Sequence, residues 1–156
     1  MLNPGIAAGP AVVTVPVLTP PTSNLLINST FTDGKASWLD CASANSTTVE
    51  TDAQTASNIL KVENAGCIYQ EFPVTEGRQY TLQCSAMSEG TMYSSISFQM
   101  SDATYNTLES QENVVAPGQF QTYTATLTAP ANSTTSAVTL YSEDITRVAS
   151  CFVEEI

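Results

Sequence analysis

Apolar residues recur at every second position in several short stretches, and this period limits the possible folds more than any other feature of the chain. In residues 79–87 the alternating apolar positions are Tyr80, Leu82, Cys84 and Ala86. The positions between them hold Thr81, Gln83, Ser85 and Met87. A similar apolar series is Ile96, Phe98 and Met100. A two-residue period is that of a β-strand with one face in a core, so we expect an all-β protein.

Turn-forming residues divide the chain into short candidate strands, and no stripe of helical period lies between them. The candidate strands are residues 24–27, 47–50, 58–62, 67–74, 79–87, 94–100, 122–128, 137–142 and 149–154. Gly or Pro marks turns at residues 75–78, 116–119 and 129–132. The length of 156 residues suits one domain. We therefore predict a single β-sandwich of about nine strands.

The N-terminal segment differs in composition from the rest, with four prolines among small and β-branched residues between positions 7 and 21. This composition favours extended chain, so we divide the protein into an arm at 1–23 and a folded domain at 24–156. Because the arm is rich in Val, we expect it to dock on this chain or a neighbour, with a solvated linker as the alternative. The candidate assembly residues are Val12, Val13, Val15, Val17 and Leu18.

Charge and composition exclude several classes of function. The chain has four Lys and Arg residues and 15 Asp and Glu residues, which gives a net charge of -11. Neither nucleic acid nor an anionic membrane surface would therefore attract it. The absence of His removes the commonest general base and excludes Ser-His-Asp catalysis. Neighbouring acidic residues such as Glu154 and Glu155 point to opposite faces of a strand and cannot act as a hydrolytic pair. We expect the protein not to be an enzyme.

The four cysteines, Cys41, Cys67, Cys84 and Cys151, lack the CxxC spacing of a zinc site. They allow three disulfide pairings, and four buried thiols are the alternative. We favour Cys41 with Cys67, at the edges of a loop near the only Trp, and Cys84 with Cys151, which both lie in apolar alternating runs. Disulfides require an oxidising compartment, so we expect an extracellular or virion-surface location.

The first 21 residues lack the basic region and cleavage site of a signal peptide. Three accounts reconcile this with disulfides: a fragment of a secreted protein, a processed mature form, or a virion component released by host lysis.

Four segments, taken in order, resemble the carbohydrate-binding modules of the family 4/9 and 22 type. They are residues 24–31 with Gly34 and Trp38, residues 69–82, residues 120–130, and the pair 138–141 and 151–154. The resemblance covers residues 24–154 and implies a galactose-binding-like β-jelly-roll. In glycan-binding members one concave sheet carries aromatic and amide side chains that receive a sugar chain.

The resemblance also implies a structural calcium ion, but the residues depart from the pattern. Thr32, Ala149 and Ser150 stand where such modules carry acidic residues, and Asp33 is the nearest remaining carboxylate. Because calcium needs several carboxylate or carbonyl oxygens, we expect no cofactor, with a structural calcium ion near Asp33 as the alternative.

Sugar recognition combines aromatic faces with amides and hydroxyls, which selects the candidate ligand-binding residues. These are Trp38, Gln83, Tyr93, Gln99 and Tyr141. For the aromatic residues a structural role is the alternative: Trp38 as a lid over the core, Tyr93 as the boundary of a loop, and Tyr141 as a cross-strand partner.

Together these features predict a non-catalytic, carbohydrate-binding-type subunit of a larger assembly, such as a phage virion decoration protein. Its partners would be proteins bound through the arm and a glycan on the concave sheet. One alternative is a secreted module that targets a polysaccharide hydrolase. Another is an extracellular filament subunit whose arm adds a strand to the next protomer.

Overall fold

The computed structural model describes residues 13–42, 46–53 and 55–156, and these contain ten β-strands. The strands are β1 (Leu39–Asp40), β2 (Thr47–Thr51), β3 (Asn58–Glu63), β4 (Gly66–Pro73), β5 (Gln79–Ser88), β6 (Ser94–Ser101), β7 (Thr107–Val114), β8 (Gln121–Thr128), β9 (Thr135–Ser142) and β10 (Ile145–Glu155). Within the described ranges, no helix has the length and hydropathy needed to cross a bilayer.

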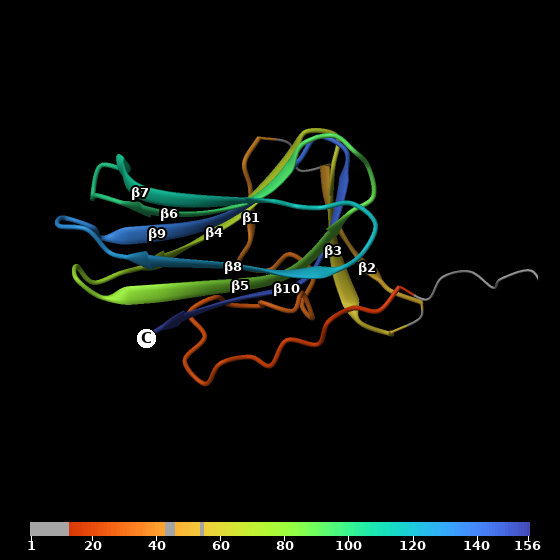
Figure 1. Ribbon diagram of the computed structural model, residues 1–156, viewed down its shortest axis with the longest axis horizontal. Coiled ribbons are helices and arrows are strands. Elements are labelled where there is room, and N and C mark those ends of the chain that lie inside the picture. Colours follow the sequence, from red (N-terminus) through yellow and green to blue (C-terminus); the bar gives the residue numbers. More distant parts are fainter. Residues whose placement is uncertain (1–12, 43–45, 54) are drawn as a thin grey trace, which may run out of the picture.

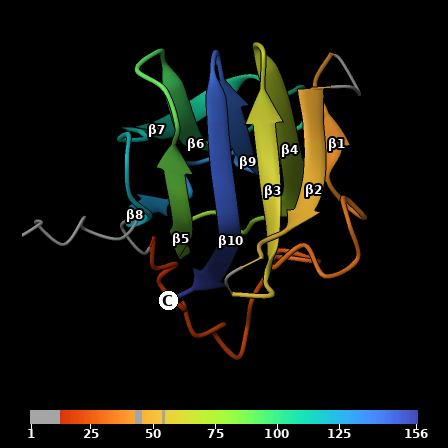
Figure 2. The same cartoon turned by 90° about the vertical axis from the view of Figure 1, so that its right-hand side faces the viewer.

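The strands form two antiparallel sheets of five strands each, stacked face to face as a jelly-roll sandwich (Figure 1). Sheet A has the order β1-β4-β9-β6-β7, and sheet B has the order β2-β3-β10-β5-β8. Figure 2 looks onto sheet B, with sheet A behind it. The predicted all-β sandwich is confirmed.

The core lies between the sheets and is built by the alternating residues that the sequence singled out. Leu82 and Cys84 of β5 point into it with Ile96 and Phe98 of β6, and none of these side chains is more than 1% exposed. Tyr80 is also buried, and its hydroxyl accepts a hydrogen bond from the backbone N–H of Thr75 at 2.9 Å. The two-residue period therefore assigned the inward faces of the central strands.

Both favoured disulfides are present. Cys84 and Cys151 are register partners on β5 and β10, buried in the core with their Cα atoms 4.1 Å apart. Cys41, just after β1, is bonded to Cys67 of β4, with a Cα separation of 5.2 Å. The first bridge joins two strands of sheet B, and the second fastens the short edge strand β1 to sheet A.

Residues 24–27, predicted to be a strand, do not form one. Instead this segment lies beside the end of β10, where the Leu25 N–H donates to the Val153 carbonyl at 2.8 Å and the Val153 N–H donates to the Asn24 side chain at 3.0 Å. The sequence prediction also missed β1 and β7.

The described part of the arm runs beneath sheet B (Figure 1, red to orange). Val15 packs against an apolar cluster on the outer face of this sheet, formed by Ile59, Met87 and Phe120, and Ala149 packs against the same cluster. Val13 and Val17 are 36% and 94% exposed, Leu18 is half-buried, and Val12 lies outside the described residues. Docking of the arm on its own chain is therefore observed at Val15.

Candidate functional site

The outer face of sheet A carries a row of polar and aromatic side chains across four strands. Strand register places Tyr69 of β4 beside Thr139 of β9, Thr139 beside Ser97 of β6, and Ser97 beside Glu112 of β7. The intervening residues of the three inner strands, such as Ile68, point into the core, so the row faces outward. We call this surface the sheet A face; its central residues are Tyr69, Tyr93, Ser97, Gln99, Glu112, Thr139 and Tyr141.

Three tyrosines gather at one end of the sheet A face. Tyr93 and Tyr141 have ring centroids 6.1 Å apart and planes tilted by 46°, and Tyr93 is 40% exposed. Tyr69 is the diagonal neighbour of Tyr141 across β4 and β9, a relation that places Cα atoms roughly 7–8 Å apart. Rings held at these distances present apolar surface and hydroxyl groups to the solvent.

Glu112 is tied to the aromatic end by hydrogen bonds. The Tyr93 hydroxyl donates to its carboxylate, and Ser95 and Ser97 also hydrogen-bond to it. These bonds, that from Tyr93 first, lower the pKa of Glu112 below its usual 4.5 despite some desolvation. The same bond raises the pKa of Tyr93. The face thus holds a charged acceptor at neutral pH, with Tyr93 fixed beside it.

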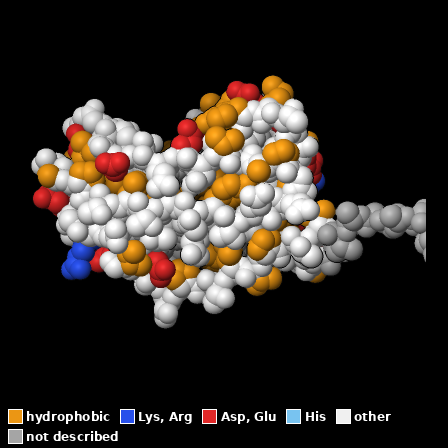
Figure 3. All heavy atoms as spheres, in the orientation of Figure 1, with side chains coloured by type: hydrophobic (Ala, Val, Ile, Leu, Met, Phe, Trp, Pro, Cys, Tyr) orange, Lys and Arg blue, Asp and Glu red, His pale blue; other side chains and the backbone are white. Residues whose placement is uncertain are grey.

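The molecule is hollowed above sheet A. In Figure 3 the upper outline of the molecule dips between a lower end on the left and a higher end on the right. Figure 1, in the same orientation, shows sheet A rising toward the loop that joins β5 to β6 at the higher end. Tyr93 belongs to that loop. A second row, next to that of Glu112, contains the register partners Glu71, Ala137, Gln99 and Ser110. The small side chain of Ala137 lies between the longer Glu71 and Gln99.

This arrangement suits an extended, hydroxyl-rich ligand. Tyrosine rings offer faces on which the C–H surface of a sugar can stack, while the hydroxyls of Ser97 and Thr139, the amide of Gln99 and the carboxylate of Glu112 can exchange hydrogen bonds with sugar hydroxyls.

The structure places Tyr93, Gln99 and Tyr141 on the sheet A face, where the two tyrosines are adjacent and Gln99 lies farther along β6. It places the other two candidate residues elsewhere. Trp38 is 4% exposed, its ring lies 5.5 Å from that of Phe31, and its indole N–H donates to the Asn28 carbonyl at 3.3 Å. This is the position of a lid over the core.

Gln83 belongs to β5 and points outward from sheet B, between Phe152 and Thr124 in register. The polar positions of β5 and β6 therefore lie on opposite sides of the sandwich, because the two strands belong to different sheets.

Tyr69 and Glu112 belong to the face but were not among the residues selected from the sequence. Tyr69 was detectable, since Ile68, Gln70 and Phe72 alternate with it and are buried. Glu112 was not, because every residue of β7 is exposed or half-buried and the strand shows no apolar period.

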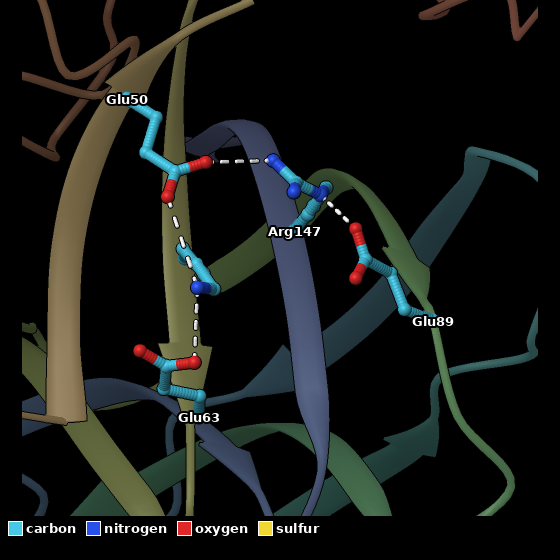
Figure 4. A network of polar contacts seen from close by, with 5 residues as sticks. Glu50, Glu63, Glu89 and Arg147 are labelled. Carbon is cyan, nitrogen blue, oxygen red and sulfur yellow. Dashed lines mark hydrogen bonds and ion pairs between the residues drawn. The ribbon is translucent and has the colours of Figure 1, made fainter.

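The outer face of sheet B has a different character, with ion pairs in place of aromatic residues at one end (Figure 4). Glu50 of β2 pairs with Arg147 of β10 at 2.9 Å and with Lys61 of β3 at 3.8 Å. Lys61 also pairs with Glu63 at 2.9 Å, and Arg147 with Glu89. Next to this network lies the apolar cluster covered by Val15. Sheet A therefore offers the more suitable surface for a glycan.

The positions at which the resemblance implies calcium do not provide its ligands. In the described ranges, no group of three or more His, Cys, Asp or Glu side chains is arranged to hold a metal ion. Thr32, Ala149 and Ser150 line one pocket, but Thr32 and Ser150 contribute hydroxyls and Ala149 a methyl group. These residues do not fit a calcium ion, which prefers six to eight oxygen ligands, usually with carboxylates among them.

A family model for a carbohydrate-binding domain matches residues 23–145 of the chain. No curated protein matches it by sequence. Among solved structures, tailspike protein 4 of bacteriophage CBA120, in its enzymatically active domain, matches with a TM-score of 0.71 and 16% identity, over 85% of this chain and 21% of that chain. This chain thus corresponds to about a fifth of the tailspike structure.

Two isolated modules match over nearly their whole length. The CBM22-1 xylan-binding domain of Paenibacillus barcinonensis Xyn10C has a TM-score of 0.63 and 9% identity, over 89% of this chain and 98% of that chain. TmCBM61, solved in complex with beta-1,4-galactotriose, has a TM-score of 0.62 and 15% identity, over 86% and 100%. At these identities the likenesses establish a shared fold.

Proposed function

The chain belongs to the carbohydrate-binding domain family, and from this premise we propose that it binds a polysaccharide on the sheet A face without reacting with it. The observation that carries the proposal is the pair of exposed Tyr93 and half-buried Tyr141 beside a row of hydroxyls and a carboxylate on the outer face of sheet A. One structural neighbour is described as xylan-binding and another as bound to a galactotriose, which supports an extended neutral glycan as ligand.

The carboxylates on the sheet A face support a binding role rather than hydrolysis. Glu71 on β4 and Glu112 on β7 are separated by three strand spacings, about 14 Å. Glycosidase carboxyl pairs lie roughly 5–9.5 Å apart. In addition, the lowered pKa of Glu112 opposes a role as general acid, which requires a raised pKa.

Replacement of the paired tyrosines tests the proposal. Tyr141→Ala and Tyr93→Ala should each weaken binding to xylan or β-1,4-galactan by about tenfold or more, or about 1.4 kcal/mol, measured by isothermal titration calorimetry. Tyr105→Ala is the matched control, because Tyr105 lies in the turn between β6 and β7 and is 69% exposed. Unchanged affinity in the Tyr141 and Tyr93 variants would refute a glycan site on this face.

The two disulfides and the family membership place the protein outside the cell. Beyond this, we propose that it is displayed on a larger assembly, such as a phage particle, and is attached through its arm. The exposure of Val13 and Val17 supports this, since these apolar side chains remain available to a partner. The structural likeness to a bacteriophage tailspike is also consistent with it.

Light scattering separates this role from the alternatives. An oligomer that dissociates in a Val13→Ser/Val17→Ser variant supports assembly through the arm. A monomer at all concentrations favours a secreted module that targets a hydrolase. An oligomer unaffected by the two substitutions shows that the side chains of Val13 and Val17 do not form the attachment.

A further inference from the structure

The three residues that stand in place of the implied calcium ligands lie close together, and the arm lies beside them. Thr32, Ala149 and Ser150 line a pocket of about 340 Å³. Arm residues 15–18 also line it, as do Thr30 and residues 56–58, at the start of β3 and directly before it. The position that would hold an ion in the resembling modules is therefore bordered in this chain by an apolar segment.

The pocket lies where sheet B is interrupted. Pairing of β10 with β3 ends at Val148, and the register of β10 against β5 shifts between Val148 and Ser150. Beyond this bulge β10 also bonds to the segment that precedes β1. The Cys151 N–H donates a hydrogen bond to the Ser29 carbonyl at 2.9 Å. Ala149 and Ser150 thus occupy a junction where the backbone changes partners, which is a place that requires support from outside the sheet.

Apolar contacts supply that support. Ile59, Met87 and Phe120 point outward from sheet B or lie over it, yet they are only 1%, 8% and 9% exposed. Val15 of the arm and Ala149 at the bulge both pack against this cluster. Without Val15, this cluster would face water over part of its surface, so its burial contributes to folding stability.

We propose that residues 13–18 act as an intramolecular clasp that holds the β10 bulge and the outer face of sheet B together, in place of a structural calcium ion. The clasp works through Val15, while Val17 of the same segment points to solvent. Stability of the domain is then independent of divalent cations and dependent on one side chain of the arm.

Thermal melting of full-length variants tests the clasp, with and without EDTA and with added calcium chloride. Val15→Asp should lower Tm by about 4 °C or more, because a charge enters the apolar cluster. Val15→Thr keeps the side-chain volume and should produce a smaller loss in the same direction. Thr14→Asp is the control on the same segment and should leave Tm unchanged, since Thr14 is exposed and does not line the pocket.

Two outcomes would overturn the proposal. If Val15→Asp and Thr14→Asp melt at the same temperature, the arm does not hold the sheet. If EDTA lowers the Tm of the wild-type chain, or calcium raises it, a metal ion still performs this role. The expected result is one Tm for the wild type in all three solutions, together with increased hydrogen exchange at Ile59 and Met87 in Val15→Asp.

Discussion

At the scale of single residues, Glu112 determines how the sheet A face depends on pH. Its pKa is lowered by hydrogen bonds, that from Tyr93 being the largest contribution. Since the folded-state pKa lies below the usual 4.5, the stabilisation from these bonds is fully present above pH 4.5. It is lost as the pH falls through the lowered folded-state value.

Tyr93→Phe removes the main donor to Glu112 and should raise its pKa toward the usual value. NMR titration of the Glu112 side-chain carboxyl measures this shift directly. Ser97→Ala should raise the pKa less, because Ser97 is the smallest of the three hydrogen-bonding contributions. Tyr105→Phe, in the turn that precedes β7, removes no group that acts on Glu112 and should leave the midpoint unchanged. An equal shift in all three variants would contradict the assignment.

Two aromatic residues show how far sequence reasoning reaches at this scale. Tyr141 follows Val138 and Leu140 with the phase of an outward residue, and this phase predicted its position. Trp38 follows no alternating run, so no period indicates which way it points. Only its contact with Phe31, made through a turn with several positive φ values, shows that it belongs to the core.

At the scale of elements, β7 explains why part of the candidate site was not predictable. Its eight residues carry no buried side chain, so hydrogen bonding rather than apolar burial defines the strand. The preceding turn is ordered by Asp102, which accepts bonds from the backbone and side chains of Thr104 and Asn106. These bonds lower the pKa of Asp102 to about 2. A strand stabilised in this way leaves no periodic signal in the sequence.

The element at the opposite edge, β1, depends on a covalent bond. It pairs with β4 over only two residues, and Cys41 directly after it is bonded to Cys67, the register partner of Tyr141. Removal of this bridge by Cys41→Ser/Cys67→Ser should cost about 3–4 kcal/mol of unfolding free energy, as expected for a loop of 26 residues. It should also weaken glycan affinity, because the β4 edge below Tyr141 is loosened.

Chemical denaturation and calorimetric titration of the same samples measure the two effects. Cys84→Ser/Cys151→Ser is the matched control, since this bridge lies in sheet B and the core. It should reduce stability without changing the affinity of the fraction that remains folded. Equal losses of affinity in both variants would show that the Cys41–Cys67 bridge has no special connection to the sheet A face.

At the scale of the whole molecule, the distribution of charge restricts the kind of glycan that can bind. The chain has only four cationic side chains, and the structure describes all of them. Lys61 and Arg147 belong to the ion-pair network on sheet B, Arg78 pairs with Glu155 at 3.5 Å, and Lys35 pairs with Asp40 at 2.8 Å. None of them lies in the outward rows of sheet A, whose charged members are Glu71 and Glu112.

With a net charge of -11 and carboxylates alone on its binding surface, the protein should reject anionic polysaccharides. Affinity electrophoresis should show retardation by neutral xylan or galactan and none by polygalacturonate at low salt. Binding of the neutral polymer should change little between low and high ionic strength, because no ion pair with the ligand is formed.

Glu71→Lys places a cation on the sheet A face and should permit weak, salt-sensitive binding of polygalacturonate, whereas Glu63→Lys on sheet B should not. Strong binding of polygalacturonate by the wild type would mean that the glycan contacts a surface other than the sheet A face.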